Sequence, residues 1–433
     1  MKYGFKIIDK IRKTSIVNKF NEVSEYQNYE RILLAEEQKR RLSNLLLYQR
    51  GRNKFYAPLL GVFSEKQILN EPLEILSYLP VTDKNFLNEH YNEIFTRDNE
   101  KAIQRKQTGG STGTPFRFYI NAESISYIWS FVYLFWKKYA DYNIGDPYCS
   151  VAGTSFYSPK RKLFYYFYHL LQNNYVIKGD IISADMDFDY KKISNAKLLF
   201  GYPSSINMLL DYYPDLFSGS KNLKAIFTTS ELLLPQVREN IERKTGKKIF
   251  DMYGANDGGI VSSECHLHNG YHYSMLNCYP ESIKSEALDG QHELVLTNLY
   301  NYDFPFIRYK VGDIGVIDKS PCPCGNPFDR ITGLKGRTRD LVYFKNKKVF
   351  HGSIINSLLL KYPEIKLYKL IQQEDFSVDL KILVQPENRF NAVAEKLHRE
   401  ISSLFNELLF RIDKLSELES TDKKFKIIES RVT

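Results

Sequence analysis

The stretch LKAIFTTSELLLPQVRENIERKTGKKIFDMYG, Leu223–Gly254, decides the fold. Its two ends, LKAIFTTSE and KKIFDMYG, are short apolar runs that stop at small or polar residues. Its middle, LLLPQVRENIERKTGKK, has the spacing of an amphipathic helix. A strand, a helix and a second strand in this order predict a β/α unit with parallel strands, whose functional loops lie at the strand ends.

The same alternation continues on both sides of this stretch. KLLFGYPS (197–204) and HELVLTNL (292–299) are further apolar runs that end in Gly, Pro, Thr or Asn clusters. The pattern over residues 120–320 therefore predicts a layered α/β domain with a mostly parallel sheet.

The segment before residue 100 has a helical pattern, as in EEQKRRLSNLLLYQR (36–50). LPVTDKNFLNEHYNEIF (79–95) predicts a loop followed by a helix that Thr82 or Asp83 caps. We expect residues 1–75 to form a helical lead-in to one large N-terminal domain over residues 1–335.

The character of the chain changes after residue 335. LKGRTRDLVYFKNKKVF (334–350) is a charged, turn-rich connection. Beyond it lie the strand-like runs YKLIQQ (368–373) and VDLKILVQP (378–386) and the helical stretch NRFNAVAEKLHREISSLFNELLF (388–410). This pattern predicts a small α+β C-terminal domain over residues 336–433.

Composition narrows the classes of partner. The formal net charge is +9 and is spread along the chain, without a basic arm, an aromatic RNA-binding signature or zinc-finger spacing, which argues against a nucleic-acid partner. The charge fits an anionic substrate, and equally a weak peripheral association with an acidic membrane surface. The N-terminus lacks the apolar run of a signal peptide, charges interrupt every apolar segment short of a membrane span, and five cysteines fit a reducing compartment. We expect a cytoplasmic protein.

The loop TGGSTGTP, Thr108–Pro115, is the richest in small residues. Glycines let main-chain N–H groups approach anionic oxygens, and Ser111, Thr112 and Thr114 add hydroxyl donors. The loop lacks the lysine of a Walker A motif and the spacing of a Rossmann fingerprint. Taken alone, it fits a flexible surface turn as well as a phosphate-binding loop.

Five further motifs follow this loop in order, namely FTTSE (227–231), DMYGANDGG (251–259), FIRYKVGDIG (306–315), GRTRDLVYFKNKKVF (336–350) and TDKKFKIIESRV (421–432). With this set, residues 75–430 resemble the adenylate-forming superfamily. Within it the chain is similar to the phenylacetate–coenzyme A ligase branch, which includes relatives encoded in capsule and polysaccharide gene clusters. The features of that branch are the LP-x-x-x-K start (79–84), GYPS (201–204), IRY-x-x-GD (307–313) and a cysteine pair after it.

The resemblance implies a set of site residues. Those of the nucleotide site are Thr108, Gly109, Gly110, Ser111, Thr112, Gly113, Thr114, Ser230, Glu231, Tyr253, Gly254, Ala255, Asn256, Asp313 and Arg337. Asp313 corresponds to the aspartate that holds the ribose hydroxyls, which its two oxygens suit. Tyr202 and Pro203 are expected beside the acid substrate. The alternatives are a core tyrosine at 253 and a turn aspartate at 313.

The resemblance also implies two residues of the reaction centre. Asp257 stands where the family usually has glutamate and is expected to bind Mg²⁺, although residues 256–259 also fit a plain turn. Lys424 corresponds to the catalytic lysine of the terminal motif. Lys423 replaces the family's usual glycine and Lys426 is close, so the assignment among three lysines stays open, beside that of a solvated charge run.

From these residues the resemblance implies an enzyme that uses ATP and Mg²⁺ to activate a carboxylic acid as its acyl-adenylate, releasing pyrophosphate. Positioning and charge neutralisation carry such chemistry, and no protein nucleophile is needed. The acyl group then passes to coenzyme A, and the C-terminal domain serves as a lid between the two half-reactions. The alternatives are an amine acceptor, as in polysaccharide or natural-product biosynthesis, and a degenerate nucleotide-binding relative.

The cysteines suggest a structural metal. CPCG (322–325) offers two thiolates from one tight turn, and ECHLHNGYHY (264–273) offers a cysteine and three histidines. We expect Cys265, His272, Cys322 and Cys324 to bind zinc, with His268 or Cys278 as substitutes and a metal-free turn as the alternative. Such a zinc ion staples a loop that flanks the nucleotide site. Cys149 reads as a buried apolar residue.

Overall fold

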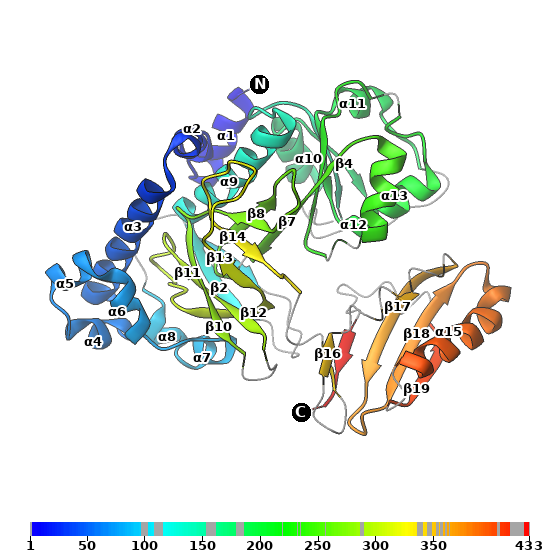
Figure 1. Ribbon diagram of the computed structural model, residues 1–433. Coiled ribbons are helices and arrows are strands. Elements are labelled where there is room, and N and C mark those ends of the chain that lie inside the picture. Colours follow the sequence, from blue (N-terminus) through cyan, green and yellow to red (C-terminus); the bar gives the residue numbers. More distant parts are fainter. Residues whose placement is uncertain are drawn as a thin grey trace.

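The structure is a computed structural model. The residues that it describes are 2–96, 103–107, 116–152, 162–178, 186–218, 220–231, 233, 235–255, 257–285, 290–335, 341–343, 349–351, 355, 358–359, 362, 364–404, 408–415 and 428–432. A large part with N-terminal helices and a long sheet is followed by a smaller part built on a separate sheet (Figure 1).

A nine-stranded sheet with the order β13-β14-β9-β8-β7-β6-β5-β3-β4 forms the centre of the large part. Its strands are β3 (Tyr148–Ala152), β4 (Asn174–Lys178), β5 (Leu198–Gly201), β6 (Ala225–Thr229), β7 (Ile249–Ala255), β8 (Ile260–Glu264), β9 (Tyr271–Tyr273), β13 (Val316–Asp318) and β14 (Arg330–Thr332). The predicted strand–helix–strand unit is confirmed as β6, α13 (Pro235–Thr245) and β7, with β6 and β7 parallel.

The prediction of a mostly parallel sheet is wrong in one respect. The strands from β4 to β7 are parallel, but the pairs from β7 to β13 are antiparallel. HELVLTNL forms β11 (His292–Asn298) of a second, antiparallel sheet, between β10 (Cys278–Lys284) and β12 (Tyr309–Ile314). An apolar strand reads alike in both settings, so the sequence pattern did not distinguish them.

The predicted N-terminal helices are present. They are α1 (Lys2–Arg12), α2 (Ile16–Glu25), α3 (Arg31–Arg52), α4 (Tyr56–Gly61), α5 (Glu65–Asn70), α6 (Pro72–Tyr78), α7 (Lys84–Glu89) and α8 (Tyr91–Ile94). Asp83, and not Thr82, caps α7, since its carboxylate accepts a hydrogen bond from the N–H of Phe86 at 2.8 Å. Thr82 instead bridges to Tyr309 on β12.

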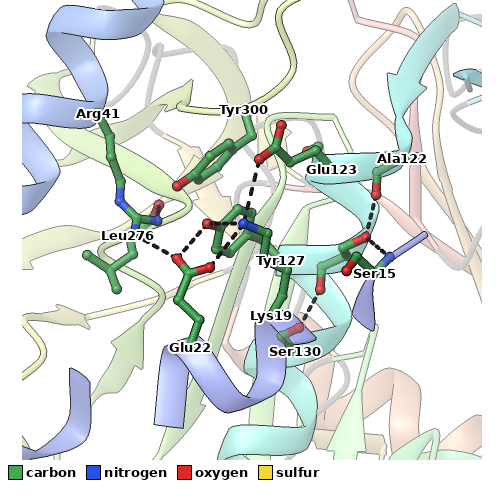
Figure 2. A network of polar contacts seen from close by, with 12 residues as sticks. Ser15, Lys19, Glu22, Arg41, Ala122, Glu123, Tyr127, Ser130, Leu276 and Tyr300 are labelled. Carbon is green, nitrogen blue, oxygen red and sulfur yellow. Dashed lines mark hydrogen bonds and ion pairs between the residues drawn. The ribbon is translucent and has the colours of Figure 1, made fainter. Parts of the chain in front are cut away.

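A buried polar network joins these helices to the α/β core (Figure 2). The Arg41 guanidinium of α3 lies against the rings of Tyr127 and Tyr300, which stack on each other with their centroids 3.9 Å apart. It also donates to the carbonyl oxygen of Leu276 and to Glu22 of α2. Tyr127 lies on α9 (Ala122–Ala140), so the network ties three helices to the end of β11.

The aromatic segment of α9 packs inside the protein. Tyr127, Phe131, Tyr133, Phe135 and Trp136 are all at most 2% exposed and belong to the main hydrophobic core. Core packing thus accounts for the aromatic side chains of this stretch. Among the described residues, no helix combines the length and the hydropathy that crossing a membrane requires.

The smaller C-terminal part has a four-stranded sheet with the order β19-β18-β17-β20. Its elements are β17 (Ile365–Gln372), β18 (Val378–Val384), α15 (Phe390–Leu404), β19 (Phe410–Lys414) and β20 (Ile428–Ser430). The expected α+β composition is confirmed, but the predicted helix is too long, because Phe410 begins β19 and is buried in a separate hydrophobic core.

Candidate nucleotide site and metal centre

The carboxyl ends of three parallel strands bring several predicted site residues together. In the registers of β5, β6 and β7, Gly201 lies opposite Thr228, and Thr229 lies opposite Met252. The residues that follow these ends are Tyr202 and Pro203 after β5, Ser230 and Glu231 after β6, and Tyr253, Gly254 and Ala255 at the end of β7. Ligands of open α/β sheets bind at this edge.

Ser230 marks the point at which the chain leaves the sheet. Its φ angle of 70° lies in the left-handed region, which serine seldom adopts and which costs on the order of 1 kcal/mol. The turn directs the backbone away immediately after the buried strand β6. Strain of this kind is concentrated at ligand-binding edges.

Tyr253 and Asp313 are joined by a hydrogen bond. The Tyr253 hydroxyl on β7 donates to Oδ2 of Asp313 on β12 at 2.7 Å, and Asp313 is only 8% exposed. Burial and the neighbouring carboxylate hold the pKa of Tyr253 well above its ordinary value. The tyrosine therefore stays a neutral donor that fixes the orientation of the carboxylate expected to hold ribose.

Asp257 and Tyr309 form a second tyrosine–aspartate hydrogen bond, in which β12 supplies the tyrosine and the turn after β7 supplies the aspartate. Tyr309 on β12 donates its hydroxyl to Oδ2 of Asp257 at 3.1 Å, just beyond β7. Each of the two sheets thus contributes one tyrosine and one aspartate. The Tyr309 partner was missed from the sequence, because 52 residues separate it from Asp257.

The turn after Asp257 depends on glycine. Gly258 and Gly259 have φ angles of 108° and 72°. A Cβ on Gly259 would lie 1.9 Å from the Asn298 side chain, and one on Gly258 2.8 Å from Leu296. Residues 257–259 do form a turn, which was the alternative interpretation of this segment. The turn also places Asp257 against β12.

Several predicted residues lie outside the described part of the chain. They are the loop residues 108–115, Asn256, Arg337 and the lysines at 423, 424 and 426. The strands on either side of the loop are β1 (Ile103–Gln107) and β2 (Arg117–Asn121), which pair antiparallel with Gln107 opposite Arg117. The loop thus connects a hairpin, whereas a Walker A loop joins a strand to a helix.

The four expected zinc ligands come together. Cys265 after β8, His272 on β9, and Cys322 and Cys324 between β13 and β14 place their ligand atoms within 4.8 Å of one another. Four atoms around a tetrahedral zinc ion lie about 3.8 Å apart when three are thiolates. The cluster is almost closed to solvent, since only Cys324 is half-buried. The donor set therefore fits a structural zinc site.

The orientation of His272 supports this fit. Its Nδ1 lies 2.6 Å from the carbonyl oxygen of Phe328, and its Nε2 lies 3.3 Å from the Cys324 sulfur. A proton on Nδ1 satisfies the carbonyl and leaves the lone pair of Nε2 for a metal. Burial lowers the pKa of His272 to about 4, so the imidazole is neutral.

The proposed substitutes do not belong to this cluster. His268 instead lies 3.1 Å from the Glu264 carboxylate, and Cys278 is buried in the main hydrophobic core. Cys149 is buried in another core cluster, as expected.

The cluster lies away from the place expected for it. In the β7–β8 hairpin, Met252 pairs with Ser263, which sets Cys265 near Phe250 at the amino end of β7. Tyr253 and Asp257 lie at the carboxyl end. The metal centre is thus built at the far end of the hairpin and does not flank the tyrosine–aspartate pairs.

A buried acid that the sequence did not reveal lies on the β7 strand of this hairpin. Asp251 is 4% exposed and accepts hydrogen bonds from Thr228 at 2.5 Å and from the hydroxyl of Tyr271 at 2.8 Å. Burial, with the nearby charge of Glu264, raises its pKa to about 7. Thr228 and Asp251 lie inside the motifs FTTSE and DMYG, so the two motifs contact each other through these side chains.

Comparison with known proteins gives two relatives by sequence. The chain is 22% identical over 383 residues to the protein CapK of Staphylococcus aureus. The aligned region covers 86% of this chain and 83% of CapK. It is 24% identical over 195 residues to the phenylacetate–coenzyme A ligase of Thermus thermophilus, covering 38% of this chain and 44% of that protein. No family model matches the chain.

Solved structures extend the likeness to nearly the whole chain. A 2-hydroxyisobutyryl-CoA ligase in its postadenylation state superposes with a TM-score of 0.64 at 16% identity, covering 91% of this chain and 89% of that one. The chain has the fold of the adenylate-forming ligases. Fatty acyl-adenylate ligases from E. coli and L. pneumophila also match, with a TM-score of 0.51 at 12% identity over 72% of this chain and 65% of theirs. The resemblance to this superfamily and to its phenylacetate–coenzyme A ligase-like branch is confirmed.

Proposed function

We propose that this protein is an ATP-dependent ligase that converts a carboxylic acid into its acyl-adenylate. The observation that carries the proposal is the pair of crossed bonds, Tyr253 to Asp313 and Tyr309 to Asp257, at the carboxyl ends of the strands. They hold two carboxylates in fixed orientations in a protein with the fold of the adenylate-forming ligases. One carboxylate suits the ribose hydroxyls and the other a divalent cation.

Each part of ATP then has its own set of residues. The main-chain N–H groups of residues 108–114 bind the phosphates, Ser230, Glu231 and residues 253–256 border the adenine, and Arg337 contacts a phosphate or ribose oxygen. Lys424 neutralises the negative charge that develops as the acid attacks the α-phosphate. The acid substrate lies near Tyr202 and Pro203. These assignments rest on the motifs and on the strand-end geometry.

The chain offers donors that fit both proposed metals. The Asp257 carboxylate is a hard oxygen ligand that would hold Mg²⁺, and the ion would supply positive charge to neutralise the triphosphate. Three thiol sulfurs and one imidazole nitrogen suit zinc, which would hold the loops after β8 and β13 together. Tyr309 and the carbonyl of Phe328 orient the two ligand groups, Asp257 and His272, through hydrogen bonds.

Coenzyme A is the acceptor that we favour for the second step. The named functions of the relatives support it, since one is a phenylacetate–coenzyme A ligase and another a 2-hydroxyisobutyryl-CoA ligase. An amine is the second candidate, because CapK, a relative whose match covers 86% of this chain, is not named for a coenzyme A reaction. We place the C-terminal domain at residues 336–433 as the lid that separates the two steps.

The reaction takes place in a reducing compartment, and we propose the cytoplasm. All five cysteines are free thiols, and three of them face one another around His272 without forming a disulfide. An oxidising compartment favours disulfides over such a cluster.

Two assays test the proposal. Exchange of labelled pyrophosphate into ATP, run with a panel of carboxylic acids, should require one class of acid, Mg²⁺ and the Asp257 carboxylate. Asp257→Ala should abolish the exchange, while Asp215→Ala, at an exposed position on the same domain, should leave it unchanged. If the acceptor is a thiol, consumption of the coenzyme A thiol should accompany turnover. If the acceptor is an amine, turnover should depend on an added amine and should consume no thiol. ATP binding without exchange for any acid would favour a degenerate relative.

A further inference from the structure

Two short helices carry an unusual number of exposed apolar side chains. On α10 (Lys162–Leu171) five large apolar residues are between 49% and 70% exposed, namely Leu163, Phe164, Tyr166, Phe167 and Leu170. On α1 three are between 48% and 79% exposed, namely Tyr3, Ile7 and Ile11. We call these eight residues the α1–α10 face. A cluster of large apolar side chains on a surface marks an interaction site.

The two helices make one continuous surface. They cross so closely at Gly4 that a Cβ there would lie 2.3 Å from the carbonyl oxygen of Leu171. Arg12 at the end of α1 donates to the hydroxyl of Tyr168 on α10 at 2.7 Å. Both helices lie at the same end of the large part, near the N-terminus (Figure 1). The exposed side chains of α1 and α10 therefore border each other.

The charge around this face is positive. Lys6, Lys10 and Lys13 are exposed and alternate along the chain with Tyr3, Ile7 and Ile11. Asp9, the one acidic residue between Met1 and Asn21 in the sequence, is engaged, because its carboxylate accepts from the Thr14 hydroxyl and from the N–H groups of Ile16 and Val17. Around α10, the sequence has no Asp or Glu between Asp146 and Asp180.

We propose that the α1–α10 face binds the surface of an anionic phospholipid membrane, with the protein lying on the bilayer. Exposed Phe, Tyr, Leu and Ile enter the headgroup region, and neighbouring lysines contact lipid phosphates. The lysines favour a membrane over a second copy of the chain as the partner of this face. In a two-fold dimer the face would meet itself, and its lysines would oppose lysines without acidic partners.

Binding to vesicles tests this proposal independently of any ligase activity. The full chain should sediment with phosphatidylglycerol-containing vesicles and hardly at all with pure phosphatidylcholine, and added salt should weaken the binding. Lys6→Glu with Lys10→Glu should weaken it about fivefold for each lysine. Phe164→Glu with Phe167→Glu should weaken it about tenfold or more, since these rings supply buried apolar area.

Matched controls separate this face from general effects of charge. Val62→Glu with Leu69→Glu changes two exposed apolar residues near α4 and α5, and Lys39→Glu with Lys66→Glu reverses two exposed lysines on α3 and α5. Both pairs should bind vesicles like the unmodified protein, and thermal unfolding should show that every variant is folded. Equal binding to both vesicle types, or no binding, overturns the proposal. So does a dimer in sedimentation equilibrium that the double phenylalanine variant dissociates.

Discussion

The hydroxyl of Tyr253 donates a hydrogen bond to the carboxylate of Asp313, at 2.7 Å, across the boundary between the nine-stranded sheet and the sheet of β10, β11 and β12. In the converse hydrogen bond, Tyr309 on β12 donates to Asp257, which follows β7. Each carboxylate is therefore positioned by a residue of the other sheet. Small shifts between the sheets would change the positions of both acids together, which makes the sheet boundary part of the proposed nucleotide site.

Substituting the two tyrosines should separate their roles. Tyr253→Phe removes the hydrogen bond from Tyr253 to Asp313, and we expect the KM for ATP to rise about tenfold, the value of one hydrogen bond to a charged group. Tyr309→Phe should mainly raise the Mg²⁺ concentration needed for half-maximal pyrophosphate exchange. Tyr190→Phe, at an exposed position on α11 (Tyr190–Asn195), serves as the control. If both substitutions changed the KM for ATP and the half-maximal Mg²⁺ concentration to the same extent, the two tyrosines would not have separate roles.

Elemental analysis should find one zinc ion per chain. Cys324→Ser should lose the metal and lower the unfolding temperature, because zinc binding to a folded site stabilises it. Cys278→Ala removes a buried cysteine outside the cluster and should keep the metal. A chelator should lower the unfolding temperature of the unmodified protein and leave that of the Cys324 variant unchanged. Full zinc content in Cys324→Ser would show that this residue is not a ligand.

Neighbouring arginines on α3 should differ sharply in their effect on stability. Arg41 is 4% exposed and bonds to Glu37, Glu22 and the Leu276 carbonyl, so Arg41→Ala removes a buried cation that serves two half-buried carboxylates and a buried carbonyl, and it should cost about 3 kcal/mol. Arg40 bonds to the same Glu37, but its side chain is 62% exposed, and Arg40→Ala should cost less than about 1 kcal/mol. Urea unfolding followed by tyrosine fluorescence measures both. Similar losses would contradict the role assigned to the network.

The buried acid Asp251 should make stability depend on pH. Its pKa is raised from 3.8 to about 7, so the folded protein holds a proton that the unfolded chain releases. The resulting stabilisation is complete below pH 4 and is lost as the pH rises through 7, by at most about 1.4 kcal/mol per pH unit. Asp251→Asn keeps the side chain neutral and should flatten the stability profile between pH 5 and 7. An unchanged profile would show that Asp251 does not titrate in this range.

The sequence was most informative where a residue's role is local. The β6–α13–β7 unit and the choice of four cluster ligands followed from runs and spacings within short segments. Contacts between distant segments were not predictable, because the partners of Asp257 and Asp313 depend on how two sheets meet. The position of the cysteine cluster likewise depends on the β7–β8 register, which the pattern of apolar residues does not specify.

Transfer of an oxygen atom tests the central claim most directly. An acid labelled with ¹⁸O in its carboxylate is incubated with the protein, ATP, Mg²⁺ and an acceptor, and the nucleotide product is analysed by mass spectrometry. Attack of the carboxylate on the α-phosphate, followed by acyl transfer, leaves one carboxylate oxygen on AMP. We predict AMP that carries one heavy oxygen. Product that is ADP, with the label in inorganic phosphate, or AMP without the label would contradict adenylation.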